Sequence, residues 1–443
     1  MALVKLEIDG RRVIAVDNQT ILAVARQHGL GEIPTLCHDE QLEPFTSCFV
    51  CVVKVKGARS LVPACSTKVT DGMVVETDTA EVRQSRRAAL ELLLSNHYAD
   101  CVGPCQQTCP AGVDIQGYAA LAALGKFREA VRLIKEKNPL PAICGRVCTR
   151  PCEVTGCRRR ELDQPVGIDN IKRFVADLDL GMAQPFKPET APPNGKRIAV
   201  VGAGPGGLSC AFLLARKGYG VQILEAQPEA GGMLRYGIRE YRLPKEVLDS
   251  EIAQILELGV KLSTNVSLGR DFTVASLRNQ GFDAVFLALG AWDSSTLRVK
   301  NEDVEGVLSG IEFLKNVGLR RRVEVSGKVM VVGGGNTAID CARTALRLGA
   351  REVTILYRRT RAEMPANPVE IEEAEREGVQ IELLVAPTQV MVEAGRVAAI
   401  ECTRMELGAP DASGRRSPKA IPGSEFQIPC DFVIAAIGQS TTM

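Results

Sequence analysis

The densest chemistry in this sequence is a block of cysteines between residues 97 and 157. They recur at gaps of three or four residues on either side of an apolar-periodic segment. Such spacing lets several thiolates converge on one inorganic core, which predicts iron–sulfur clusters. Zinc stays an alternative, although its separated C-x2-C pairs are absent from this block, and disulfides are disfavoured because the chain is long and we expect no signal peptide. The candidate ligands are Cys101, Cys105, Cys109, Cys144, Cys148, Cys152 and Cys157.

A second cysteine set precedes this block, with the spacing C-x10-C-x2-C-x13-C. Residues 3–16 before it predict a β-hairpin around an Asp9-Gly10 turn, and a helix follows, with Asp17 or Asn18 as its expected cap. Two strands, a helix and a cysteine-bearing loop predict a small ferredoxin-like fold. Four thiolates around two irons are the favoured interpretation, with zinc or buried thiols as alternatives. The candidate ligands are Cys37, Cys48, Cys51 and Cys65.

This spacing closely resembles the [2Fe–2S] domain of iron hydrogenases, of the large iron–sulfur subunit of respiratory complex I and of NAD-dependent formate dehydrogenases. The runs PTLCHDE and VPACSTKVTDGMVVET carry the match, while Thr46 and Ser47 stand where that family usually has glycine. The resemblance implies a β-grasp ferredoxin-like domain over residues 1–80 that holds one [2Fe–2S] cluster.

Residues 81–180 are expected to form a helical domain. An amphipathic helix is predicted over 81–96, and two short helices separated near Gly125 lie between the cysteine groups. The stretches around Cys109-Pro110, GRVC at Cys148 and PCE at Cys152 resemble the two-cluster domain of the glutamate synthase small subunit and of the amino end of dihydropyrimidine dehydrogenase. That resemblance implies two [4Fe–4S] clusters.

Two such clusters need eight ligands, and the block holds seven cysteines. The position at which the resembling domains place a ligating Gln or Glu is Lys172 here, and an ammonium group cannot ligate iron. We expect Cys144 to complete the set of Cys109, Cys148 and Cys152. For the set of Cys101, Cys105 and Cys157 we expect His97, with Asp100 as a weaker alternative and an ordinary helix-end histidine as the competing interpretation of His97.

A proline-rich linker over 181–196 precedes a glycine turn. Gly202, Gly204 and Gly207 form G-x-G-x-x-G between a predicted strand and helix, and Glu225 ends the next strand. This context predicts a dinucleotide site in which the backbone approaches the pyrophosphate and Glu225 accepts from the ribose hydroxyls.

The same unit recurs with Gly333, Gly335 and Ala338 as G-x-G-x-x-A. Two such units predict two nucleotides, most simply a flavin (FAD) and a nicotinamide. Tyr357 stands where Glu225 stood and is followed by Arg358 and Arg359. Guanidinium groups in place of a carboxylate favour NADP over NAD, with a solvated basic loop as the alternative.

Residues 231–252 and 357–379 resemble the glutamate synthase small subunit and the flavoprotein subunit of NADH-dependent ferredoxin–NADP reductases. The resemblance implies that residues 197–325 form the first part of an FAD domain and that residues 326–429 form an NADP domain. Residues 430–443 are then expected to form a return strand into the FAD domain, truncated before the family's Gly-Asp segment. The resemblance adds the candidate cofactor-binding residues Gly206, Gly232, Leu234, Gly237, Asn336 and Thr337. The expected fold class is α/β multidomain, with two Rossmann-like domains.

Composition excludes other classes. A net charge of +1 and an aromatic content of 4% argue against nucleic acid, and no apolar run reaches the length of a membrane span. Fifteen cysteines suggest the reducing cytoplasm. The leading hypothesis is a cytoplasmic oxidoreductase that moves electrons between NADP(H) and a ferredoxin or partner redox subunit, in a hetero-oligomer of formate dehydrogenase, hydrogenase or glutamate synthase type. The alternatives are an electron donor to a glutamate synthase amidotransferase and a non-catalytic wiring subunit without FAD.

Overall fold

The computed structural model describes residues 2–40, 42–95, 102–412 and 414–441. The chain forms two compact units, Met1–Val102 and Gly103–Met443. The first contains β1 (Leu3–Ile8), β2 (Arg11–Val16), α1 (Ile21–Gln27), β3 (Val52–Val55), β4 (Val62–Pro63), β5 (Val74–Glu76) and α2 (Ala80–Ser95).

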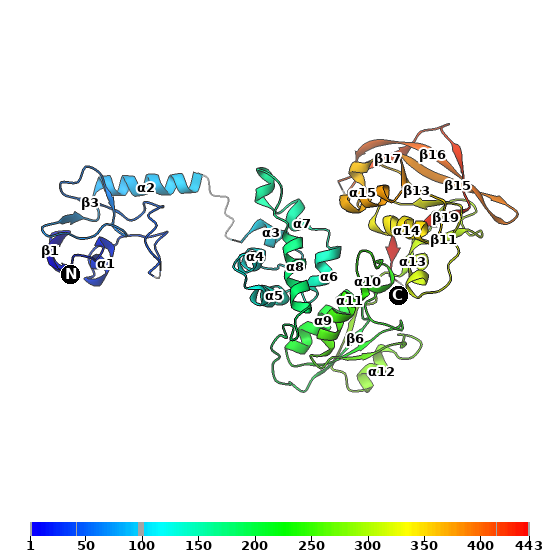
Figure 1. The fold of residues 1–443 in the computed structure, drawn as a ribbon, viewed down its shortest axis with the longest axis horizontal. Coiled ribbons are helices and arrows are strands. Elements are labelled where there is room, and N and C mark those ends of the chain that lie inside the picture. The colour runs from blue at the N-terminus through cyan, green and yellow to red at the C-terminus, as the bar shows by residue number, and fades with distance from the viewer. Residues whose placement is uncertain (1, 41, 96–101, 413, 442–443) are drawn as a thin grey trace. The chain divides into compact units, whose positions relative to one another are not determined.

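The sheet of the first unit has the order β2-β1-β5-β3-β4 (Figure 1). The predicted hairpin is present: β1 pairs antiparallel with β2 across Asp9 and Gly10, both at positive φ. β1 also pairs parallel with β5, which makes the sheet mixed. The expected cap of α1 was wrong. Thr20, in extended conformation, accepts from Ala23 N–H, because it directly precedes the first helical residue.

Helix α2 matches the helix expected over 81–96 within a residue at each end. It belongs to the first unit, because the Arg86 guanidinium donates to Val52 O of β3 at 2.8 and 3.2 Å. The boundary expected at residue 80 therefore falls at the start of a helix that packs against the ferredoxin-like sheet.

The second unit begins with a helical region. Gly125, at φ +71°, separates α4 from α5 as the sequence predicted. Gly145 lets α6 approach α8, since a Cβ there would lie 2.8 Å from Arg173 Cα. The elements are α3 (Pro104–Thr108), α4 (Ile115–Ala123), α5 (Phe127–Lys135), α6 (Pro141–Val147), α7 (Pro151–Val154), the 3-10 helix η1 (Arg158–Glu161) and α8 (Ile168–Leu180).

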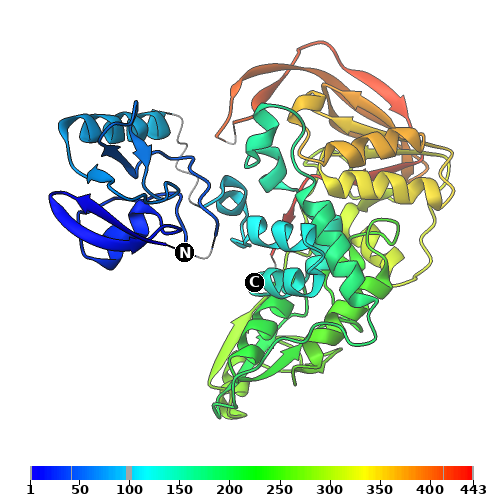
Figure 2. The ribbon, with the colours of Figure 1, turned by 60° about the vertical axis from the view of Figure 1, so that its left-hand side comes forward.

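A parallel sheet in the order β8-β7-β6-β9 follows. It lies in the green part of the ribbon in Figure 2. Its central strand RIAVV is buried over its last four residues, as expected for a strand covered on both faces. The elements are β6 (Arg197–Val201), α9 (Pro205–Arg216), β7 (Gly220–Leu224), α10 (Met233–Tyr236), α11 (Lys245–Leu256), β8 (Lys261–Ser263), α12 (Val274–Asn279) and β9 (Ala284–Leu287).

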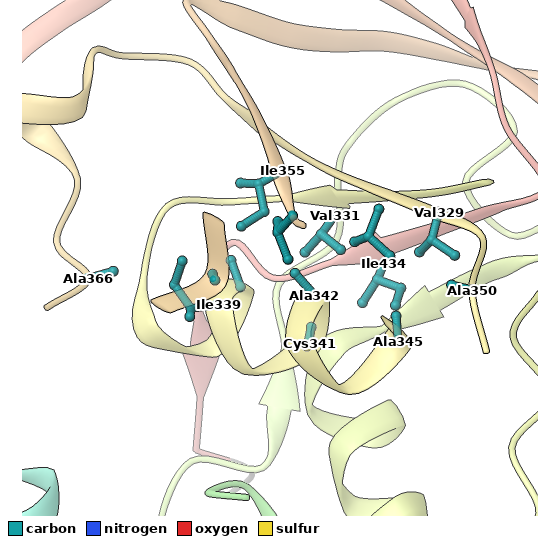
Figure 3. Packing of buried hydrophobic residues seen from close by; sticks show 14 of the residues in the cluster. Val329, Val331, Ile339, Cys341, Ala342, Ala345, Ala350, Ile355, Ala366 and Ile434 are labelled. Atoms are coloured by element: carbon teal, nitrogen blue, oxygen red, sulfur yellow. The ribbon is translucent and has the colours of Figure 1, made fainter. Parts of the chain in front are cut away.

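The second parallel sheet has the order β11-β19-β12-β13-β14, and Figure 3 shows α14 packed on it through an apolar core. The elements are β10 (Asp293–Ser294), β11 (Val307–Ser309), α13 (Gly310–Gly318), β12 (Lys328–Val332), α14 (Asn336–Arg347), β13 (Glu352–Tyr357), the 3-10 helix η2 (Arg361–Glu363), α15 (Pro368–Arg376), β14 (Gln380–Leu383), β19 (Phe432–Ala435) and β20 (Gln439–Ser440).

The last strands differ from the expected return strand over 430–443. The apolar strand β19 lies inside the second sheet between β11 and β12, because its side chains are buried there. β11, which the sequence assigned to the FAD domain, also lies in this sheet. The chain turns back only at β20, which pairs antiparallel with β10.

An antiparallel sheet is inserted between β14 and β19. It consists of β15 (Val385–Glu393), β16 (Arg396–Pro410), β17 (Arg416–Ala420) and β18 (Phe426–Pro429), and β16 pairs with the other three. Within the described ranges, no helix is both long and apolar enough to cross a membrane.

Candidate cluster and nucleotide sites

Four thiols approach one another in the cysteine loop of the first unit. Cys48 and Ser47 hydrogen-bond to the half-buried Cys37 sulfur, and the Cys48 backbone contributes most to lowering the pKa of Cys37 to about 7. Burial raises the pKa of Cys65 to about 11, and a hydrogen bond with Cys51 adds to this. Side-chain hydrogen bonds thus link Cys37 to Cys48 and Cys51 to Cys65, and Cys37 also lies close enough to Cys65 to raise its pKa. Two thiols at each of two irons is the donor set of a [2Fe–2S] cluster, so the residues fit that group.

The backbone of this loop is strained at two positions. Thr46 and Phe49 adopt φ of +60° and +54°, a region that disfavours residues with a Cβ. Thr46 stands where the resembling family has glycine, and its hydroxyl hydrogen-bonds to the Cys65 sulfur. This bond offers a physical reason why a threonine is tolerated in a glycine conformation.

The helical region brings the central cysteines into two groups. Burial raises the pKa of Cys152 to about 12, and Cys148 and Cys109 lie close enough to raise it further. Burial likewise raises the pKa of Cys105, which has Cys157 beside it. Helix α3 reaches the second cysteine segment because Gly156 leaves room: a Cβ there would lie 2.7 Å from Thr108 Oγ1.

Backbone amides donate to two of these sulfurs. Arg150 N–H lies 3.3 Å from Cys148 Sγ, and Val166 N–H lies 3.4 Å from Cys157 Sγ. Such donors stabilise negative charge on sulfur, which suits thiolate ligands of iron. In the described part of the chain, no three His, Cys, Asp or Glu side chains are arranged so that together they could hold a single metal ion.

Cys144 and Lys172 lie next to the first of these groups. Burial raises the pKa of Cys144 to about 11, and Lys172 and Cys148 are among its charged neighbours. The Lys172 ammonium is buried and contacts Asp169 Oδ1 at 2.6 Å. Lys172 therefore places a positive charge beside these sulfurs. The predicted ligands His97 and Cys101, and the alternative Asp100, lie outside the described residues.

The first glycine turn follows β6, and its close backbone contacts are possible because glycine has no Cβ. Gly202 has φ +105°, and a Cβ there would lie 2.2 Å from Ala288 O; a Cβ on Gly207 would lie 1.9 Å from Gly202 O. A Cβ on Gly206 would meet no atom within 4 Å, and the Gly204 backbone faces Gly232, so a side-chain-free cradle opens at the start of α9. This cradle fits a dinucleotide pyrophosphate.

Three other residues that were predicted to bind the first nucleotide each have a structural role. Glu225 is buried and accepts from Ala203 N–H and Gln227 N–H, each at 2.7 Å, so it shapes the turn while its carboxylate keeps further acceptor positions. Leu234 is a core residue. Gly237 ends α10 against Met233.

The second glycine turn opens onto a cavity of about 780 Å³. Gly333, at φ +144°, fits because a Cβ there would lie 2.2 Å from Ala436 O, and Gly335 precedes the first residue of α14. Thr337 lines the cavity. The remaining two predicted residues have supporting roles: Ala338 is buried in the core, and Asn336 Oδ1 accepts from Asn367 N–H at 2.9 Å.

The two predicted arginines differ in environment, although both line this cavity. Arg358 is exposed. Arg359 is 4% exposed and donates to Asp411 Oδ2 at 2.6 Å and to Arg416 O at 2.7 Å. The two arginines are therefore adjacent in sequence but lie in different environments.

Among the cavity residues that sequence reasoning missed are Arg298, Arg415 and Gln439. Arg415 comes from the inserted antiparallel sheet, and Gln439 Nε2 lies 3.4 Å from Thr337 Oγ1. The G-x-G-x-x-A motif does not predict how far along the chain any of these three residues should lie. The Arg415-Arg416 pair in the run SGRRS was the available signal.

Comparison with known proteins adds the family. The model described as pyridine nucleotide-disulphide oxidoreductase matches residues 196–443, more than half of the chain. The chain belongs to this family. Further models match at 78–183, dihydropyrimidine dehydrogenase domain II with a 4Fe-4S cluster, and at 1–80, a 2Fe-2S iron-sulfur cluster binding domain.

Relatives of this oxidoreductase include the small chain of NADPH glutamate synthase from Escherichia coli, 37% identical over 76% of this chain and 74% of that protein. The NADP(+)-dependent formate dehydrogenase subunit beta of Moorella thermoacetica is 44% identical over 77% of this chain and 51% of its own length. The NADPH-Fe(3+) oxidoreductase subunit beta of Geobacter sulfurreducens is 47% identical over 76% and 51%. The chain spans about half the length of the last two.

These matches confirm the predicted family and fold class: a pyridine-nucleotide oxidoreductase similar to the glutamate synthase small chain, with an amino-terminal 2Fe–2S domain and a 4Fe–4S domain.

Proposed function

We propose that this chain moves electrons between NADP(H) and a one-electron acceptor on a partner redox subunit, through FAD, two [4Fe–4S] clusters and one [2Fe–2S] cluster. The observation that carries the proposal is the charge of the second cavity. Among the described residues that line it, every charged side chain is an arginine. An NAD site ordinarily presents a carboxylate to the ribose hydroxyls, whereas a 2′-phosphate calls for guanidinium groups.

Bound FAD would take up two electrons with a hydride and release them singly, which matches clusters that carry one electron each. The residues of the chain provide binding and orientation. The α14 amino end and its glycine turn suit the nicotinamide dinucleotide pyrophosphate, and the α9 turn suits that of FAD. No acid or base side chain is assigned a catalytic role.

The partner is proposed from the relatives. Two of them are named beta subunits of a formate dehydrogenase and of an Fe(3+) oxidoreductase, and a third is a glutamate synthase small chain. The amino-terminal 2Fe–2S domain favours a partner of the kind that the two beta subunits have. This domain supplies an exit for electrons, which the glutamate synthase small subunit would lack. We therefore propose a hetero-oligomer with a catalytic redox subunit.

For the central clusters we propose one ligand set of Cys109, Cys144, Cys148 and Cys152. The proximity of Cys148 and Cys109 to Cys152, and of Cys144 to Cys148, supports it. The second set would be Cys105 and Cys157 with Cys101 and His97, of which the last two rest on sequence spacing. The variant Cys144→Ala should lower the iron content below the expected value of about ten per chain. The control Cys402→Ala, at a buried thiol of the inserted sheet, should keep the full content.

Anaerobic reduction of the purified full chain tests the electron path. NADPH should reduce the flavin absorbance and then produce the electron paramagnetic resonance signals of reduced clusters. NADH at the same concentration should do so at least tenfold more slowly. Equal rates with both nucleotides would refute the choice of NADP, and cluster signals that never appear would refute the relay.

A further inference from the structure

Helix α8 places a buried cation next to the cysteine of α6. A Cβ on Gly145 would lie 2.7 Å from Arg173 Cβ and 2.8 Å from Arg173 Cα, so α6 and α8 meet at backbone distance directly after Cys144. Lys172 precedes this contact point on α8 and is buried. Cys144 and Cys148 are among the charged neighbours of its ammonium group. The ammonium therefore lies beside sulfurs of the first proposed ligand set.

Asp169, one turn earlier on α8, holds this ammonium in place. Lys172 Nζ lies 2.6 Å from Asp169 Oδ1, and Arg150 Nε lies 3.2 Å from Asp169 Oδ2. Asp169 N–H donates to Glu153 Oε1 at 2.7 Å, which ties this end of α8 to α7, and Arg150 lies 3.9 Å from Glu153. The four charges balance as a network, but they occupy different places. Lys172 lies at the side of α6, whereas Asp169 is engaged with residues at the start of α7.

A charge in this position acts on the electron affinity of a cluster. An iron–sulfur cluster with thiolate ligands becomes more negative by one unit when an electron enters, so a nearby cation stabilises the reduced form more than the oxidised form. The interaction is strong where the protein excludes water. Arg150 N–H, 3.3 Å from Cys148 Sγ, acts in the same direction but offers only the partial charge of a backbone amide. The full charge of Lys172 should therefore have the larger effect.

We propose that Lys172 raises the reduction potential of the [4Fe–4S] cluster whose ligands include Cys144 and Cys148. This inference rests on the proposed function, in which reduced FAD supplies the electron. One electron enters the cluster in this step, no bond to the protein forms or breaks, and no proton moves. Lys172 does not bind iron. It acts on the cluster through space, and Asp169 acts through Lys172 as a positioning residue.

An anaerobic potentiometric titration of the full chain, followed by electron paramagnetic resonance, measures the potential of each cluster. A chemical reductant replaces NADPH, so that the nucleotide and flavin sites are not needed. Lys172→Met removes the charge, and Lys172→Arg keeps it. The double variant of Lys172→Met with Asp169→Asn removes both ion-pair partners and guards against misfolding from an unpaired carboxylate. Arg173→Met, at an exposed guanidinium on the same helix, is the matched control.

The account predicts a shift of a single [4Fe–4S] signal. At a fixed potential, the ratio of reduced to oxidised cluster should fall at least tenfold in Lys172→Met, a downward shift of about 59 mV for one electron. The double variant should shift the same signal downward. Lys172→Arg and Arg173→Met should keep the ratio within about threefold of the parent protein. The [2Fe–2S] signal should not move in any variant, and the iron content should be unchanged, because an ammonium is not an iron ligand.

An unchanged ratio in both Lys172→Met and the double variant would overturn the proposal. Loss of iron in both would overturn it too, because Lys172 would then serve the assembly of the site. An equal shift in Lys172→Arg, or equal shifts of all clusters, would show that charge beside this cluster is not the cause. If NADPH reduced no cluster of the parent protein while the Lys172→Met shift was present, the proposed electron path would fail and the role of Lys172 would stand.

Discussion

The first nucleotide unit, β6–α9–β7, and the second, β12–α14–β13, turn their glycines against a neighbouring strand in the same way. A Cβ at Gly202 would lie 2.2 Å from Ala288 O, and a Cβ at Gly333 would lie 2.2 Å from Ala436 O. The units diverge at the end of the second strand, where Glu225 is buried against backbone amides and Arg358 is exposed in a cavity. Both turns suit a dinucleotide pyrophosphate, and under the proposed function the residues at the end of the second strand distinguish the two nucleotides.

The helices after the two turns are also anchored differently. α9 packs through apolar residues such as Leu208 and Phe212. α14 also packs through an apolar core, but in addition it carries a charge network: Asp340 pairs with Arg242 at 2.6 Å, and Arg343 pairs with Glu377 at 2.7 Å. Because Arg242 lies between α10 and α11, which belong to the region of the first glycine turn, this network ties the two nucleotide-binding regions together.

The largest effect should come from a methyl group in either turn. Gly202→Ala should abolish FAD retention and leave NADP+ binding intact, whereas Gly333→Ala should do the reverse. Both side chains would meet a carbonyl oxygen and adopt an unfavourable positive φ, which together cost about 2–4 kcal/mol. FAD released by acid and NADP+ affinity measured by calorimetry report the two sites separately.

The matched control is Gly349→Ala, which has φ +104° but meets no atom within 4 Å. It should lose stability without losing either nucleotide. If Gly202→Ala and Gly333→Ala each abolished both nucleotides, the two units would not be independent sites and the comparison would fail.

A smaller effect is expected at the end of β13. Arg358→Ala should weaken NADPH binding 10- to 100-fold, about 1.5–3 kcal/mol for charge-assisted bonds to phosphate, and leave NADH binding unchanged. Steady-state KM values for both nucleotides measure this selectivity. Arg351→Ala, at the exposed opposite end of the same strand, should change neither KM. Equal losses for NADPH and NADH would assign Arg358 to general binding.

The charge network on α14 predicts that the stability of this nucleotide-binding region depends on pH. Hydrogen bonds from Arg347 and Arg343 lower the pKa of Glu377 to about 2. The pKa is lower in the folded state, so this stabilisation is present above about pH 4.5 and is lost as the pH falls toward 2.

Glu377→Gln should therefore cost about 1–2 kcal/mol of unfolding free energy at pH 7, and the difference from the parent protein should shrink toward pH 2. Denaturant unfolding at several pH values measures it. Glu257→Gln, which changes the equivalent residue at the end of α11, should have little effect at any pH. A pH-independent loss in Glu377→Gln would mean that packing, rather than charge, accounts for the loss.

Sequence reasoning succeeded where local rules decide the structure. The Asp9-Gly10 hairpin and the break at Gly125 follow from backbone conformations that glycine and turn residues favour, and both are present. The family, the fold class and the glycine turns followed from motifs with fixed spacing. The cap of α1 was misplaced by two or three residues, because several adjacent polar residues all satisfy the capping preference.

What the sequence could not give are contacts between distant segments. Arg358 and Arg359 are adjacent and both line the cavity, but Arg359 is buried and hydrogen-bonded to Asp411 and to Arg416 O, more than fifty residues later in the chain. Arg415 enters the cavity from a sheet without any nucleotide motif. The position of β19 within the second sheet likewise depends on its pairing with β12.

The central claim is that the two glycine units hold two different nucleotides, and nucleotide stoichiometry tests it most directly. The purified chain, saturated with FAD and titrated calorimetrically with NADP+, should contain one FAD and bind one NADP+ per chain, with NAD+ binding at least tenfold more weakly. Two equivalents of one nucleotide, or displacement of FAD by NADP+, would contradict the claim.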